Sequence, residues 1–241
     1  MMKGNRKYWH NVFAVAWVIL GLFIVLAIVP IVQGGGNPNP AVLPLNSHSH
    51  GNTYGEWSAR WWQWLLSIPE AANPNLDTTG ANCAEGQVGQ VWFLAGSFDS
   101  TPVTRDCTIP TGRALFFPIL NTVFGAGVGD CEPSNPGVPC DVNALRALAA
   151  APLDNPITLE ASIDGVELKD LINYRVQSPV FSLTFPAGAV FGLPSGTFTP
   201  QVSDGYWLML APLSAGTHTI HFKGVRTDGF ELEVTYNLTI K

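Results

Sequence analysis

ELEVTYNLTI, residues 231–240, alternates apolar and polar side chains over its whole length. Successive side chains of a strand point to opposite faces, so this alternation predicts a strand with one buried and one solvated face. Such a strand is typical of an antiparallel sheet that packs on a core through one side.

Further strands are predicted on the N-terminal side of this segment. Tyr206–Leu210 and Thr217–Phe222 are apolar or alternating runs of strand length. Ile157–Ile163 and Val166–Leu168 flank the dipeptide Asp164-Gly165, which type I′ hairpin turns prefer. The C-terminal third of the chain is therefore expected to be β throughout.

Two more apolar runs, Val91–Ala95 and Ala114–Leu120, also read as strands. Pro118 lies inside the second run and cannot donate a ladder hydrogen bond, which predicts an edge strand or a bulge there. Together the short strands predict a mainly β fold, a two-sheet antiparallel sandwich of jelly-roll or Ig-like topology with one or two short helices.

Two helices are predicted beside the strands. Between Tyr54 and Ile68 the large apolar side chains recur every three or four residues, as in an amphipathic helix, and Pro69 ends this pattern. The second helix covers Val142–Ala150, with Asp141 as its N-cap.

The N-terminal segment predicts insertion into a membrane. Val12–Val32 carries no charged or polar side chain and would measure about 31 Å as a helix, close to the hydrocarbon thickness of a bilayer. Lys3, Arg6 and Lys7 precede it and no cation follows until Arg60, which orients the N-terminus toward the cytoplasm. The predicted parts are a cytoplasmic N-terminus (1–11), a transmembrane anchor or uncleaved signal (12–32), a flexible linker (33–53) and a disulfide-bearing β-sandwich ectodomain (54–241).

A cleaved signal peptide is the alternative for this segment. Its apolar core would be long, since such cores hold about 7 to 15 residues, but Val32-Gln33-Gly34 offers a cleavage site. With the anchor retained, the protein is a single-span protein of the bacterial inner membrane with a periplasmic or extracellular ectodomain. With cleavage, it is secreted.

Four cysteines, Cys83, Cys107, Cys131 and Cys140, follow the apolar segment. In an exported chain they predict two disulfides, and proximity in sequence favours Cys83–Cys107 and Cys131–Cys140 among the three possible pairings. They lack the C-x-x-C spacing of a zinc site, and we expect no cofactor.

Charge excludes nucleic acid as a partner. After the apolar segment, nine Lys and Arg residues stand against all eighteen Asp and Glu, which leaves the ectodomain near −9. The nine cations are scattered singly, so the sequence offers no basic patch for binding phosphates.

Tryptophan is concentrated in the first predicted helix, where residues 57–64 hold four of the eight. Trp62 points away from the apolar stripe, and Glu56 and Arg60 lie beside it one turn apart. These three are candidate binding residues, with a Glu56–Arg60 salt bridge as the structural alternative. Trp92 is a second candidate platform for stacking on a sugar.

Metal and catalytic sites have few candidates. His48 and His50 are the candidate metal ligands, but two ligands are too few for a closed site. Glu231 and Glu233 share a strand face about 6 to 7 Å apart, within the range of a glycosidase pair. Their neighbours on that face are those of an ordinary solvated sheet surface.

YGEWSARWWQW (54–64), VWFLAG (91–96), CTIP (107–110) and RALFFP (113–118) together resemble a group of uncharacterised exported bacterial proteins. The resemblance extends over about residues 50 to 240. It implies a bacterial envelope location, and it carries over no activity and no site residue.

These features predict a non-enzymatic, membrane-anchored interaction module of the envelope, serving as an accessory or structural subunit of a membrane protein complex. Its partners would be other membrane or envelope proteins, and residues 12–32 would contact the lipid bilayer. A carbohydrate-binding module that uses Trp62 or Trp92 and a cell-wall hydrolase are the alternatives.

Overall fold

The computed structural model describes residues 39, 41–131 and 140–241. The predicted cytoplasmic segment (1–11), the predicted anchor (12–32) and the first part of the predicted linker lie outside these residues. Among the helices that the structure describes, none is long and apolar enough to cross a membrane.

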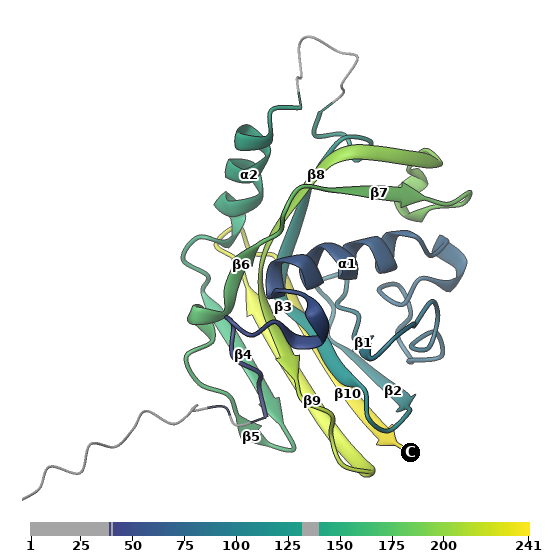
Figure 1. Ribbon diagram of the computed structural model, residues 1–241, viewed down its shortest axis with the longest axis vertical. Coiled ribbons are helices and arrows are strands. Elements are labelled where there is room, and N and C mark those ends of the chain that lie inside the picture. The colour runs from purple at the N-terminus through teal and green to yellow at the C-terminus, as the bar shows by residue number, and fades with distance from the viewer. Residues whose placement is uncertain (1–38, 40, 132–139) are drawn as a thin grey trace, which may run out of the picture. The chain divides into compact units, whose positions relative to one another are not determined.

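Within the described residues, the strands form two five-stranded sheets (Figure 1). Sheet A has the order β1-β3-β8-β6, with β7 also paired to β8, and sheet B has the order β2-β10-β9-β4-β5. Sheet A contains β1 (Val91–Phe93), β3 (Ala114–Gly125), β6 (Arg175–Gln177), β7 (Phe181–Phe185) and β8 (Gly196–Leu210). Sheet B contains β2 (Val103–Ile109), β4 (Thr158–Ile163), β5 (Val166–Glu167), β9 (Gly216–Val225) and β10 (Glu231–Ile240). The prediction of a mainly β fold with two packed sheets is confirmed.

Both sheets are mixed, so the prediction of purely antiparallel sheets is wrong. β1 runs parallel to β3, and β2 runs parallel to β10, with Cys107 opposite Leu238. Parallel neighbours cannot be joined by a tight turn, and most of the domain separates β2 from β10 in sequence. The alternation in residues 231–240 fixes which face of the strand is buried, but it does not fix the direction of the neighbouring strand.

Sheet B has one buried face. In β10 the alternate residues Leu232, Val234, Tyr236 and Leu238 are at most 2% exposed, as the alternation predicts. They face sheet A, where Phe117 of β3 stacks on a ring of β9. The opposite face of sheet B carries the polar residues.

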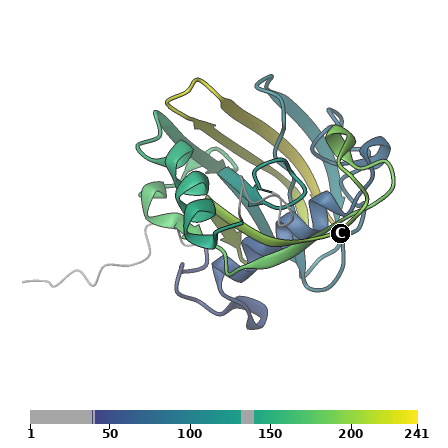
Figure 2. The same cartoon turned by 90° about the horizontal axis from the view of Figure 1, so that it is seen from above.

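Sheet A is covered on both faces. Phe117 contacts sheet B through Phe222, with ring centroids 4.9 Å apart. Its neighbour Phe116 points the other way and meets Tyr54 of α1 at 5.8 Å. Helix α1 (Tyr54–Leu66) lies against β3, β6, β7 and β8 (Figures 1 and 2). This double cover explains why β8 is buried at every position from residue 201 to 210.

Both predicted helices are present. The side chain of Thr53 accepts a hydrogen bond from the Glu56 N–H and so caps α1, which ends two residues before the predicted Ile68. Helix α2 (Val142–Ala150) has the predicted bounds, is capped by Asp141 and packs on β3 and β8. Short 3-10 turns are η1 (Ser49–Gly51), η2 (Glu70–Ala72), η3 (Ala151–Leu153), η4 (Leu171–Tyr174) and η5 (Val190–Gly192).

Two local predictions concern turns and bulges. The β4–β5 hairpin turns at Asp164 and Gly165, both with positive φ (51° and 77°), as a type I′ turn requires. β3 is not an edge strand, because it pairs with both β1 and β8, but its pairing with β1 covers only residues 114 to 116 and does not reach Pro118. The alternative bulge is present, because the register with β8 shifts between Pro118 and Leu120.

The second part of the predicted linker lies on the domain. Val42 is 1% exposed and forms an isolated bridge with Leu210, and the Leu43 N–H donates to the Met209 carbonyl at 2.8 Å. The Asn-Pro pattern before it favours an extended tether, but a buried valine and backbone pairing to β8 attach this segment to the domain.

Both predicted disulfides form, Cys83–Cys107 and Cys131–Cys140, with Cα atoms 5.9 and 5.2 Å apart. The first joins the loop before β1 to β2, and the second closes the segment between β3 and α2. Disulfides persist in oxidising compartments, so they indicate an extracytoplasmic location for the domain.

Candidate functional site

The tryptophans predicted to stack on sugars are buried. Trp62 is 7% exposed and Trp92 is 8% exposed. The ring of Trp62 meets that of Trp61 edge-on, with centroids 5.0 Å apart. The prediction assumed that α1 is covered on one side, but β7 also runs along it, where Gln63 donates to the Ser182 carbonyl. These two rings therefore offer no exposed face on which a sugar could stack.

Glu56 caps α1 instead of pairing with Arg60. Its Oε2 accepts hydrogen bonds from the Thr53 N–H at 2.7 Å and from the Thr53 hydroxyl at 2.9 Å. The bond from the Thr53 N–H holds the pKa of Glu56 below its usual range. Arg60 lies over the ring of Trp57, 5.4 Å from its centroid. In the described chain no ion pair joins Glu56 to Arg60.

The candidate metal ligands are not part of a cluster. His50 Nδ1 lies 2.9 Å from Gln90 Oε1, so one ring nitrogen is already engaged. Among the described residues, no group of three or more His, Cys, Asp or Glu side chains is placed to hold a metal ion.

The carboxylates of Glu231 and Glu233 share one cation. Lys223 Nζ lies 2.6 Å from Glu231 Oε1 and 2.8 Å from Glu233 Oε2, across the β9–β10 pair. The bonds from Lys223 and His221 hold the pKa of Glu233 below its usual range. A glycosidase acid needs a raised pKa, so this arrangement is an ion-pair network on the solvated face of sheet B.

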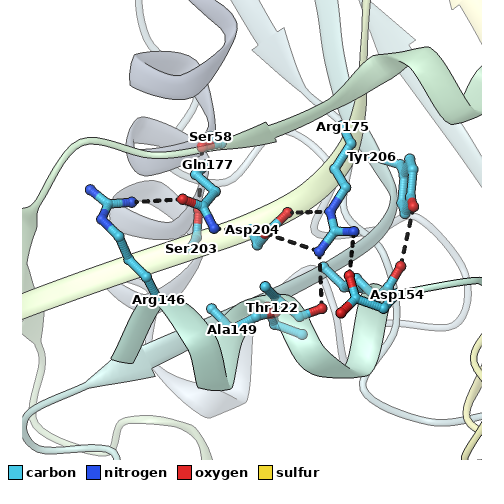
Figure 3. A network of polar contacts seen from close by, with 12 residues as sticks. Ser58, Thr122, Arg146, Ala149, Asp154, Arg175, Gln177, Ser203, Asp204 and Tyr206 are labelled. Carbon is cyan, nitrogen blue, oxygen red and sulfur yellow. Dashed lines mark hydrogen bonds and ion pairs between the residues drawn. The ribbon is translucent and has the colours of Figure 1, made fainter. Parts of the chain in front are cut away.

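A partly buried ion pair lies between α2 and sheet A (Figure 3). Asp204 of β8 is 1% exposed, and Arg175 donates to both its oxygens, at 2.9 and 3.2 Å. Arg175 also donates to Asp154 at 2.7 Å and to the Ala150 carbonyl at 2.9 Å. Gln177 donates to Asp204 at 3.0 Å.

This network joins the end of α2 to β6 and β8. Burial lowers the pKa of Arg175, but its bonds to Asp204 and Asp154 outweigh that effect and raise the pKa above its ordinary value. The guanidinium also lies over the Tyr206 ring, 5.7 Å from its centroid. The charged groups are engaged with one another, so we assign the network a structural role. The network could have been predicted from Asp204, which is a lone carboxylate next to a long apolar run in the sequence.

Asp164, His218 and Ser214 approach one another like a hydrolase triad. His218 Nδ1 lies 2.8 Å from Asp164 Oδ2, and Nε2 lies 3.3 Å from Ser214 Oγ. However, Nε2 also lies 3.0 Å from the Ser214 carbonyl oxygen, which only accepts. Acceptors beside both ring nitrogens favour the doubly protonated ring, and the bond to Asp164 raises the pKa of His218. A general base needs a free Nε2, so this contact is a structural link between the β4–β5 turn and the connection from β8 to β9.

A cavity of about 780 Å³ opens beside β2, within the size range of ligand pockets. We call it the aromatic cavity and define it by Leu76, Phe98, Asp99, Thr104 and Phe191. The rings of Phe98 and Phe191 meet edge to face, with centroids 4.8 Å apart. Phe191 is 66% exposed and Leu76 is 42% exposed, so the mouth of the cavity presents apolar groups to water.

The backbone of Phe191 supports a special role for this position. Its φ is +58°, in the left-handed region that residues other than glycine rarely adopt. Such conformations persist where the surroundings fix them, and they concentrate at ligand-binding sites. Here the conformation turns the ring outward against Phe98.

The polar lining of the aromatic cavity is rich in acceptors. Asp99 is its one carboxylate, and the described lining contains no Lys, Arg or His. Asn75 forms part of the floor and is 5% exposed, and no described group donates to its Oδ1.

No protein-family model, curated protein or solved structure matches this chain. The site is therefore defined by its geometry, and the aromatic cavity is the candidate functional site. Sequence reasoning missed it because Phe98 and Phe191 lie in loops, where apolar periodicity gives no signal. The sequence feature that could have pointed to the cavity is a phenylalanine next to Ser or Gly in each loop.

Proposed function

We propose that the protein is a non-enzymatic, membrane-anchored interaction module of the bacterial envelope, and that its ectodomain binds a partner protein at the aromatic cavity. The observation that carries the proposal is the exposure of Phe191 and Leu76 at the mouth of the cavity. Burying apolar surface contributes about 25 cal/mol of favourable free energy per Å². Aromatic side chains in such pockets dominate binding at interfaces.

The anchor and the resemblance support the membrane part of the proposal. An apolar helix over residues 12–32 would hold the disulfide-bearing domain at the membrane surface, and the resemblance to exported bacterial proteins fits the same location. A domain held there meets membrane partners at a high effective concentration, which suits an accessory subunit.

Native electrophoresis tests this proposal. Membranes of the source cells are solubilised gently, and the chain is located by blotting in the wild type, in Phe191→Ala and in Val166→Ala. Val166 is 69% exposed on β5, at the opposite edge of sheet B from β2, and serves as the matched control.

We expect the wild type and Val166→Ala to migrate within a larger complex and Phe191→Ala to migrate alone. Migration of the wild-type chain alone would contradict the accessory-subunit proposal. If Phe191→Ala stays in the complex, the aromatic cavity is not the surface that binds the partner.

A further inference from the structure

We infer that the aromatic cavity receives the side chain of a basic residue, arginine or lysine, from an extended segment of the partner. This inference rests on the proposed binding function of the cavity and names the chemistry of its ligand. It stands on the ring geometry, the charge of the lining and the edge of β2 beside Thr104.

The two rings form a corner and not a platform. Phe98 and Phe191 are inclined at 65°, whereas a sugar stacks on a flat aromatic face. A long side chain fits a corner, because its methylene stem can lie against one ring and its cationic end over the face of the other. The exposed ring of Phe191 and the side chain of Leu76 supply the apolar contacts for such a stem.

The charge of the lining selects a cation. Asp99 Oδ1 accepts from the Thr101 N–H and from the Thr101 hydroxyl, both at 2.9 Å, which fixes the carboxylate in place. The described groups engage only this oxygen, so Oδ2 remains for a ligand. A guanidinium or ammonium would meet this carboxylate and the acceptors of the floor, and an anionic ligand would be repelled.

A buried cation below the floor does not reverse this preference. Arg105 is 1% exposed and directs its donors at backbone carbonyls, including Asp77 O at 2.6 Å and Gly96 O at 2.7 Å. These carbonyl oxygens and the carboxylate of Asp77, which interacts electrostatically with Arg105, offset its charge. The acid that faces the cavity is Asp99.

The edge of β2 accounts for the choice of an extended segment. β2 is an edge strand, and the Asp106 N–H points outward and donates to the Thr79 carbonyl at 2.9 Å. Backbone groups two residues apart in a strand point the same way, so those of Thr104 also point outward, and Thr104 lines the aromatic cavity. A partner segment can pair with Thr104 as residue 79 pairs with Asp106, which places one of its side chains beside the rings.

The test uses the purified full-length chain in detergent and an array of acetylated heptapeptides with randomised flanks. The central residue is arginine, lysine, glutamate or citrulline, which has the shape of arginine without its charge. The variants are Phe191→Ala and Asp99→Asn, since asparagine keeps the Oδ1 that Thr101 binds. Val166→Ala and Asp170→Asn are the matched controls on another part of the surface.

We expect the arginine and lysine peptides to bind at least ~10-fold more strongly than the citrulline peptides, which corresponds to about 1.4 kcal/mol. Phe191→Ala and Asp99→Asn should remove this difference, and the two controls should keep it. Equal binding of the arginine and citrulline peptides, or no effect of Asp99→Asn, would overturn the inference.

A parallel glycan array separates this inference from the proposed function. Binding of a cell-wall glycan that depends on Phe191, without peptide binding, would overturn the basic-peptide inference but leave the cavity as a binding site. If neither array binds and Phe191→Ala stays in its native complex, both the inference and the role of the cavity fail.

Discussion

Removing the guanidinium of Arg175 is expected to destabilise the domain by about 3 kcal/mol. Arg175→Met keeps most of the methylene stem but deletes the two hydrogen bonds, at 2.9 and 3.2 Å, that the carboxylate of Asp204 receives. Asp204 is 1% exposed and would keep only the bond from Gln177. Loss of one partner from a buried ion pair costs about 3 to 5 kcal/mol. We expect the lower end, because the Arg175 side chain is 26% exposed.

Urea unfolding at pH 7, followed by tryptophan fluorescence, measures this loss. The matched control is Lys169→Met, which breaks a pair with Glu167 whose side chains are 61% and 76% exposed and should cost less than about 1 kcal/mol. The double variant Arg175→Met/Asp204→Asn should recover part of the loss, because it leaves no unpaired charge in the core. Equal costs for the two single variants, or no recovery in the double variant, would refute the reasoning.

Three further predictions concern local stability. Thr53→Ala removes the cap of α1 and should cost about 1 kcal/mol in thermal unfolding, so an unchanged melting temperature would contradict the cap. The pKa of His218 is raised by Asp164, so their contact stabilises the fold fully below about pH 6.5 and weakens as pH rises through the raised pKa. It also weakens in acid, where Asp164 takes up a proton despite its lowered pKa. The stability gap between the wild type and His218→Gln should therefore be largest near pH 5 to 6, and a gap that grows toward pH 9 would contradict this. Cys83→Ser/Cys107→Ser opens a loop with a sequence separation of 24 and should cost about 3.5 kcal/mol in urea unfolding, and a loss below about 1 kcal/mol would count against it.

Local features of the fold could be predicted from the sequence because each depends on neighbouring residues. The alternation in β10, the Asp164-Gly165 turn and the Asp141 cap of α2 are set by side-chain periodicity and backbone preference within a few positions. The disulfides were predicted from four cysteines in an exported chain, and proximity in sequence favoured the pairing that forms. These signals do not depend on which strands lie side by side.

Strand direction and burial on a second side could not be predicted, because they depend on distant segments. The parallel pairing of β2 with β10 joins residues more than a hundred positions apart. Trp62 was expected to be exposed because periodicity identifies one buried stripe, whereas β7 provides a second cover for α1.

The aromatic cavity could not be predicted from the sequence for a similar reason. Phe98 and Phe191 are brought together from two loops, and an isolated phenylalanine in a loop gives no sign of its partner. Glu56 and Arg60, the charged pair that helix spacing favours, are instead held by Thr53 and by the ring of Trp57.

Photo-cross-linking from position 191 in living cells tests most directly whether the aromatic cavity binds a partner protein. Benzoylphenylalanine replaces Phe191 in one strain and Val166 in another, and adducts that form under ultraviolet light are sized by blotting and identified by mass spectrometry. The account predicts a protein adduct from position 191 and none from position 166. No adduct at position 191, or the same adducts from both positions, would contradict it.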